Sequence, residues 1–116
     1  MQVQVHTDDK IHGGESLAEW AQREIQDRLA RFREHLTRVE VFLADENSIK
    51  GGNDKRCRLE ARVAGRPPVA VTAEAEKVAE ALAKAADKLI HALDSDLGRA
   101  KDKHGHDTIR TQGVGE

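Results

Sequence analysis

Two short alternating runs, followed directly by one long amphipathic stretch, constrain the fold of this chain more than any other feature of its sequence. Apolar and polar residues alternate over residues 58–63 and 69–73, which is typical of strands with one solvent-exposed face. The stretch from Glu76 to Lys103 instead spaces its apolar residues in steps of three and four, as an amphipathic helix does. These residues are Val78, Leu82, Ala85, Leu89 and Leu93. We therefore expect the last strand to lead into a helix that packs back on the sheet.

The first half of the chain predicts a strand, a helix and a second strand. Residues 1–7 and 38–44 alternate like the later runs. Between them, Ser16 followed by Glu19 reads as a capping box, in which each side chain satisfies a free backbone N–H at a helix start. We expect this helix to begin at Ser16 and to run to about His35. Its apolar residues are Leu17, Ala21, Ile25, Leu29, Phe32 and Leu36.

The resulting order of elements is strand, helix, three strands and helix. Helices confined to one face of a mostly antiparallel sheet give an α+β two-layer sandwich. We therefore expect a four-stranded sheet with two helices on one face, in which a right-handed crossover pairs the first two strands in parallel. Residues 1–103 would form this single domain. Residues 104–116 show no period and few apolar residues, so we expect them to form a flexible C-terminal tail.

The composition places the chain among small cytoplasmic proteins. A length of 116 residues leaves room for one domain with one core. No apolar run approaches the roughly 20 residues that span a bilayer, and residues 1–5 lack the basic and apolar regions of a signal peptide. We expect no membrane partner. The single cysteine, Cys57, cannot form an internal disulfide, and its place in the alternation predicts a small buried side chain.

Basic residues are unevenly distributed in a chain whose formal net charge is −2. On the second predicted helix, Lys77, Lys84, Lys88, His91 and Arg99 form a stripe roughly a third of a turn from the apolar one. Such a stripe is either a solvated helix face or a binding surface, and the residues alone leave both readings open. The sheet face away from the helices would carry a second basic set, Arg38, Arg56, Arg58 and Arg62.

Motifs for catalysis and metal binding are weak. The Gly51-Gly52 pair is not followed by the GK[ST] of a phosphate-binding loop, and Cys57 is expected to be buried without a paired histidine. His104 and His106 lack the further preorganised ligands that a tight metal site requires. We therefore expect no enzymatic activity, no metal, no cofactor and no small-molecule substrate.

Several short pieces of the sequence are informative through their order, although each is weak alone. They are Met1-Gln2-Val3, Leu17 with Glu19-Trp20, the strand from Val39 to Leu43, Ala73-Glu74, Ala81-Leu82 and Asp87-Lys88-Leu89. In this order and spacing they resemble the ribosome hibernation promoting factor and ribosome-associated inhibitor family, which is also called the sigma-54 modulation protein family. The resemblance covers about residues 1–103 and is to the short form, which lacks a separate dimerising domain.

The resemblance implies a non-enzymatic protein that binds the small ribosomal subunit and its 16S-type rRNA. Such a protein occludes the path of mRNA and tRNA and inhibits translation on idle ribosomes, as in stationary phase or stress. The sequence does not determine the oligomeric state, for which we expect a monomer. The basic residues that the resemblance assigns to RNA binding are Lys84, Lys88, His91, Arg23, Arg28, Arg31, Arg99, Lys101 and Lys103.

Two other readings of the same pattern stay open. One is a diverged protein-interaction module that keeps the fold but has lost ribosome binding, because Asp94, Asp96 and Asp102 interrupt the basic end of the last helix. The other is a double-stranded RNA-binding domain, which reads A-form RNA through lysines at the start of its last helix. Only Lys77 stands there, so this reading ranks last. Convergence of the basic residues of both helices on one surface would favour ribosome binding.

Overall fold

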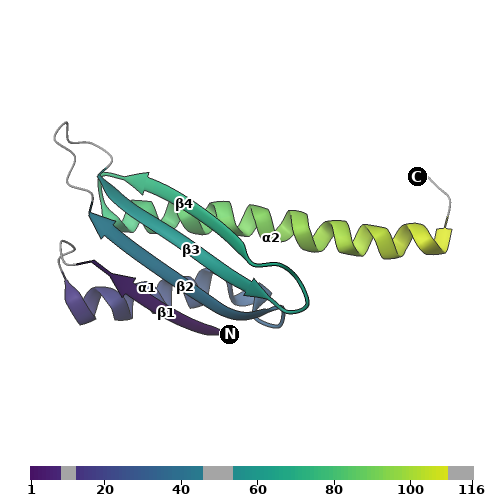
Figure 1. The fold of residues 1–116 in the computed structure, drawn as a ribbon, viewed down its shortest axis with the longest axis horizontal. Coiled ribbons are helices and arrows are strands. Elements are labelled where there is room, and N and C mark those ends of the chain that lie inside the picture. The colour runs from purple at the N-terminus through teal and green to yellow at the C-terminus, as the bar shows by residue number, and fades with distance from the viewer. Residues whose placement is uncertain (9–12, 46–53, 110–116) are drawn as a thin grey trace.

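The alternating runs form one four-stranded sheet in the computed structural model, which describes residues 1–8, 13–45 and 54–109 and, for residues 98–109, the backbone alone. The strands lie in chain order across the sheet (Figure 1). They are β1 (Gln2–Thr7), β2 (Leu36–Asp45), β3 (Lys55–Val63) and β4 (Val69–Ala75). β1 pairs with β2 in parallel, and the two other pairs are antiparallel, so the predicted mixed sheet is confirmed.

Both long helices cover the same face of this sheet (Figure 1). They are α1 (Gly14–Arg28), which a short 3-10 helix η1 (Ala30–Phe32) follows, and α2 (Val78–Ile109). α1 packs against β1, whereas α2 packs against β4 and β3. The β-α-β-β-β-α order and the two-layer α+β class that the sequence predicts are therefore confirmed. β1 and β4 form the two edges of the sheet, and each edge runs beside one helix.

The core lies between the sheet and the two helices. Val39, Val41 and Leu43 of β2 alternate with more exposed residues, as expected for a sheet with one open face. Cys57 and Leu59 of β3 are fully buried beside them. Buried residues of the helical segments and of the turn between α1 and η1 complete the core, among them Ala21, Ile25, Leu29, Leu82, Ala85, Leu89 and Leu93. Burial also raises the pKa of the Cys57 thiol to about 12, because the thiolate cannot be solvated there.

The first helix differs from the prediction at both ends. It starts at Gly14 rather than at Ser16, and its N-cap is Gly13, which makes no side-chain capping bond. The capping box predicted from Ser16 and Glu19 is therefore wrong. Gly13 has φ of 113°, and a Cβ added there would lie 2.9 Å from the Cβ of Leu17, so the helix start depends on a residue without a side chain.

The end of α1 is also earlier than expected, at Arg28 rather than about His35. The 3-10 turn η1 takes over and still brings Phe32 into the core. A 3-10 helix repeats every three residues, so it keeps the apolar spacing that the sequence shows. At the other end of the chain, α2 extends to Ile109, past the expected end at Lys103. Residues 110–116 of the predicted tail lie outside the described residues.

Candidate nucleic-acid interface

Two lysines of α2 reach back to the exposed edge of the sheet. Lys88 Nζ donates a hydrogen bond of 2.7 Å to the backbone carbonyl oxygen of Thr72, and Lys84 Nζ lies 3.5 Å from the carbonyl oxygen of Glu74. Thr72 and Glu74 belong to β4, whose outer side has no neighbouring strand among the residues that the structure describes. The two lysines, one helical turn apart, therefore follow the β4 edge and cover its free carbonyl groups.

These two ammonium groups keep most of their binding capacity. An ammonium group has three N–H donors, so a bond to one carbonyl leaves two donors for another acceptor. Both lysines are exposed, and the structure describes no carboxylate partner for either. His91 is exposed one turn beyond Lys88, and Lys77 is exposed just before the helix begins. Together, Lys77, Lys84, Lys88 and His91 form what we call the α2 basic flank.

The basic residues of the first helical segment have different surroundings. Arg31 Nη2 donates to Asp94 Oδ2 of α2 at 2.8 Å, and its guanidinium lies 4.4 Å from the centre of the Phe32 ring. Arg28 Nε donates to Glu24 Oε1 at 3.2 Å. These two arginines are thus neutralised locally. Arg23 is exposed, and it makes no ion pair within the described part of the chain.

The predicted RNA-binding residues therefore fall into two groups rather than one patch. Asp94 lies six residues after Lys88, which places it about 120° around the helix, on the side of α2 that meets Arg31. Asp87, seven residues before Asp94, is exposed on that same side. Carboxylates thus line the side of α2 that meets Arg31, about a third of a turn from the α2 basic flank. Side chains of the other candidates, Arg99, Lys101 and Lys103, lie outside the described residues.

The open face of the sheet has nearly balanced charges. Arg38 Nη2 donates to Gln4 Oε1 at 2.6 Å and lies 3.5 Å from Glu40 Oε1. Arg58 pairs with Glu60 at 2.8 Å. The ring of Phe42, the aromatic residue on this face, is stacked by His6 at 4.8 Å between centroids. Base stacking needs a free aromatic ring, so this face does not form the platform of a sheet that stacks single-stranded RNA.

Comparison with known proteins assigns the chain to a family. Residues 3–105 match the family described as Sigma 54 modulation protein / S30EA ribosomal protein, which is most of the chain. The chain belongs to this family. The matched range includes the α2 basic flank and every other residue that the sequence assigns to RNA binding. No curated protein matches the sequence.

Two solved structures share the fold of this S30EA family member. The crystal structure of the Thermus thermophilus Protein Y N-terminal domain has a TM-score of 0.59 and 17% sequence identity, covering 77% of this chain and 91% of that one. A ribosomal subunit interface protein from Coxiella burnetii has a TM-score of 0.57 and 16% identity, covering 88% and 99% of the two chains. At such identities the likeness supports the fold, whereas family membership supports an association with the ribosome.

One contact of this S30EA family member was not anticipated from the sequence. Arg66, in the turn between β3 and β4, donates from Nη1 to Asp96 Oδ1 at 2.9 Å and so ties α2 to the sheet. The opposite charges of Arg66 and Asp96 are visible in the sequence, but the two residues are thirty positions apart, so no local pattern pairs them.

Among the described residues, no helix has the length and apolar character to cross a membrane. Over the same residues, no three His, Cys, Asp or Glu side chains are grouped as metal ligands.

Proposed function

We propose that this protein is a ribosome-associated translation inhibitor of the hibernation type, which binds the small ribosomal subunit and occludes the path of mRNA and tRNA. The rRNA-binding surface would be the α2 basic flank, with Lys84 and Lys88 at its centre and Arg23 as a secondary contact. The protein would act in the cytoplasm as a monomer, without a cofactor. No chemical step is required, because occupancy of the path by a folded domain is enough to inhibit translation.

One observation above the others supports this surface. Lys84 and Lys88 are exposed cations beside backbone carbonyl groups rather than carboxylates, and Lys88 is held there by a bond of 2.7 Å. A carbonyl acceptor carries no formal negative charge, and it leaves two N–H donors of each ammonium group for phosphate oxygens. Ordering the Lys88 side chain before binding also reduces the entropy that is lost when the complex forms.

Co-sedimentation with ribosomes and separated subunits on sucrose gradients tests the proposal. The wild-type protein is expected to sediment with the small subunit at low salt and near physiological salt. The variant with Lys84→Glu and Lys88→Glu should lose this association while keeping its circular dichroism spectrum and thermal melting. The matched control is Arg33→Glu with Arg62→Glu, which changes the net charge equally at two exposed arginines that have no ion pair in the described part of the chain.

The salt dependence gives a quantitative check. Each phosphate contact that is lost lowers the slope of log K against log salt by about 0.7–0.9. Replacing Lys84 and Lys88 with glutamine should therefore lower the slope by about two such steps if both lysines bind phosphate. Equal slopes for the wild-type and the glutamine variant would remove the α2 basic flank from the interface.

A second candidate function is a protein-interaction module on the same fold that does not bind ribosomes. The pairing of Arg28 with Glu24 and of Arg31 with Asp94 favours this alternative, because carboxylates repel RNA phosphates. Absence of wild-type sedimentation with either subunit at both salt concentrations, for a folded protein, would support the module and reject the inhibitor.

A further inference from the structure

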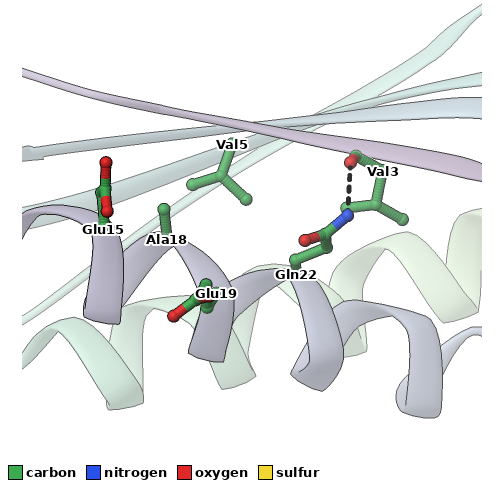
Figure 2. Close-up of a pocket in the computed structure, with 6 residues that line it drawn as sticks. All are labelled: Val3, Val5, Glu15, Ala18, Glu19 and Gln22. Carbon is green, nitrogen blue, oxygen red and sulfur yellow. Dashed lines mark hydrogen bonds between the residues drawn. The ribbon is translucent and has the colours of Figure 1, made fainter.

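The two edges of the sheet are protected differently. The β4 edge is covered by Lys84 and Lys88. At the β1 edge, Gln22 Nε2 of α1 donates to the carbonyl oxygen of Val3 at 3.2 Å. Backbone groups point to alternate sides along a strand, so Val5 also turns its N–H and C=O away from β2. Figure 2 shows that Gln22 reaches Val3, whereas no drawn side chain of α1 reaches the Val5 backbone.

A hollow of about 290 Å³ lies beside this open edge. Val3 and Val5 form its strand side, and Ala18 and Gln22 of α1 form part of its helix side (Figure 2). Pockets for small molecules usually measure about 300–1,000 Å³ and enclose most of the ligand. This hollow is at the small end of that range. Its size suits the side chains of a passing polypeptide better than a whole small molecule.

The remaining residues of the hollow are acidic. Glu15 and Glu19 are one helical turn apart on α1, both are exposed, and neither has an ion pair in the part of the chain that the structure describes. No basic residue lines the hollow. Edge strands are commonly protected by lysine or proline, but β1 contains neither. Within the described residues, the β1 edge thus combines the outward-facing backbone groups of Val5, two valines and two carboxylates that make no ion pair.

We propose that the β1 edge binds an extended, basic polypeptide segment, which adds to the sheet as a fifth strand. The segment would exchange backbone hydrogen bonds with Val5, place an apolar side chain in the hollow and direct lysine or arginine side chains to Glu15 and Glu19. Strand addition takes its affinity from the main chain and its specificity from alternate side chains. The exposed Gln22 side chain can swing away from Val3 as the segment pairs there.

The charges at the β1 edge favour a basic polypeptide over RNA and over a second copy of this chain. RNA phosphates would be repelled by Glu15 and Glu19. Two copies pairing through their β1 edges would bring four carboxylates together, and pairing β1 with the β4 edge of a second copy would displace Lys84 and Lys88 from their carbonyl partners. A basic segment would be attracted by Glu15 and Glu19 and would leave Lys84 and Lys88 in place.

Fluorescence anisotropy with a labelled peptide of about eight residues, in which lysine and valine alternate, tests the proposal. The wild-type protein is expected to bind the peptide at low salt and more weakly near physiological salt. Glu15→Gln with Glu19→Gln should weaken binding about five- to tenfold, which corresponds to the loss of two exposed ion pairs. The control is Glu34→Gln with Glu76→Gln, which removes two exposed carboxylates elsewhere and should leave affinity close to wild type.

A second peptide separates strand addition from simple charge attraction. Methylation of alternate backbone nitrogens removes the donors that a fifth strand needs while leaving the lysines unchanged, so its binding should be lost. Hydrogen exchange at the Val5 amide should slow in the unmodified complex. Equal binding of both peptides, equal weakening by the control variant, absence of wild-type binding, or self-association through this edge in sedimentation equilibrium would overturn the proposal. Lys84→Glu with Lys88→Glu should leave peptide binding intact, so this result is independent of ribosome binding.

Discussion

Lys88 donates from Nζ to the backbone carbonyl oxygen of Thr72 at 2.7 Å, so a side chain of α2 covers the outer edge of β4. The same lysine is central to the proposed rRNA surface. Its hydrogen bond to the Thr72 carbonyl therefore protects the exposed edge of β4 and also holds a cation in place. Two kinds of substitution at Lys88 would separate these roles. One removes both the hydrogen bond and the charge, and the other removes the hydrogen bond alone.

Lys88→Ala is expected to lower the free energy of unfolding by about 0.5–1 kcal/mol, because one exposed hydrogen bond is lost. Lys84→Ala should have a smaller effect, since its distance to the carbonyl oxygen is 3.5 Å. Urea unfolding measures both values. If Lys84→Ala proved more destabilising than Lys88→Ala, Lys88 would not be the main side chain that protects the β4 edge.

Gly13→Ala is expected to be more harmful to stability than Ser16→Ala. The alanine would adopt φ of 113° and place its Cβ 2.9 Å from the Leu17 Cβ, so a loss of about 1–3 kcal/mol is expected. Ser16 makes no capping bond, and its replacement should change stability by less than about 0.5 kcal/mol. Thermal melting of the two variants checks the order. A large loss of stability for Ser16→Ala would show that Ser16 caps the helix after all.

Asp94→Asn should strengthen ribosome binding if the proposed function holds. The substitution frees Arg31, whose guanidinium is paired with Asp94 at 2.8 Å, for contact with phosphate. The slope of log K against log salt should steepen by about 0.7–0.9 for the one added contact. Glu34→Gln removes the same charge at an exposed site away from Arg31 and is the control. Identical slopes for the two variants would show that Arg31 stays away from the RNA.

Alkaline pH should destabilise the protein through Cys57. Its folded-state pKa of about 12 lies above the ordinary value of 9.0. Below pH 9 the thiol is protonated in both states, and its contribution to stability is complete. Above that pH the unfolded chain ionises while the folded chain does not, so stability falls by up to about 1.4 kcal/mol per pH unit until the folded thiol ionises. Cys57→Ala should remove this component in urea unfolding series at pH 8–11. A slope that Cys57→Ala leaves unchanged would show that other groups cause the loss.

The fold could be predicted because burial and periodicity report the same packing. Alternation placed Val39 and Leu59 on the inner face, and helical steps placed Leu89 on the apolar stripe. The limits of α1 could not be predicted in the same way. At its C-terminal end, a turn with three-residue spacing buries Phe32 as well as a continued α-helix would. At its N-terminal end, the spacing of Ser16 and Glu19 does not show that the helix already begins after Gly13.

The candidate site was predicted less completely than the fold. The spacing of Lys84 and Lys88 identified a basic stripe, but it carried no information about the carbonyl groups of β4 that hold them. Arg31 was grouped with these lysines, although Asp94, 63 positions later, neutralises it. Partners so far apart in the chain meet only through the packing of whole elements, which a local pattern does not record.

The parallel pairing of β1 with β2 also affects the order in which the protein can form during its own synthesis. Gln2 pairs with Arg38, whereas β2 and β3 pair residues as close in the chain as Asp45 and Lys55. At synthesis rates of about 5–20 residues per second, β1 emerges roughly 2–7 s before its partner strand exists. Within that interval α1 is completed before β2, so it can cover Val3 and Val5 before the sheet forms. β1 thus waits longer for its partner strand than β2 does.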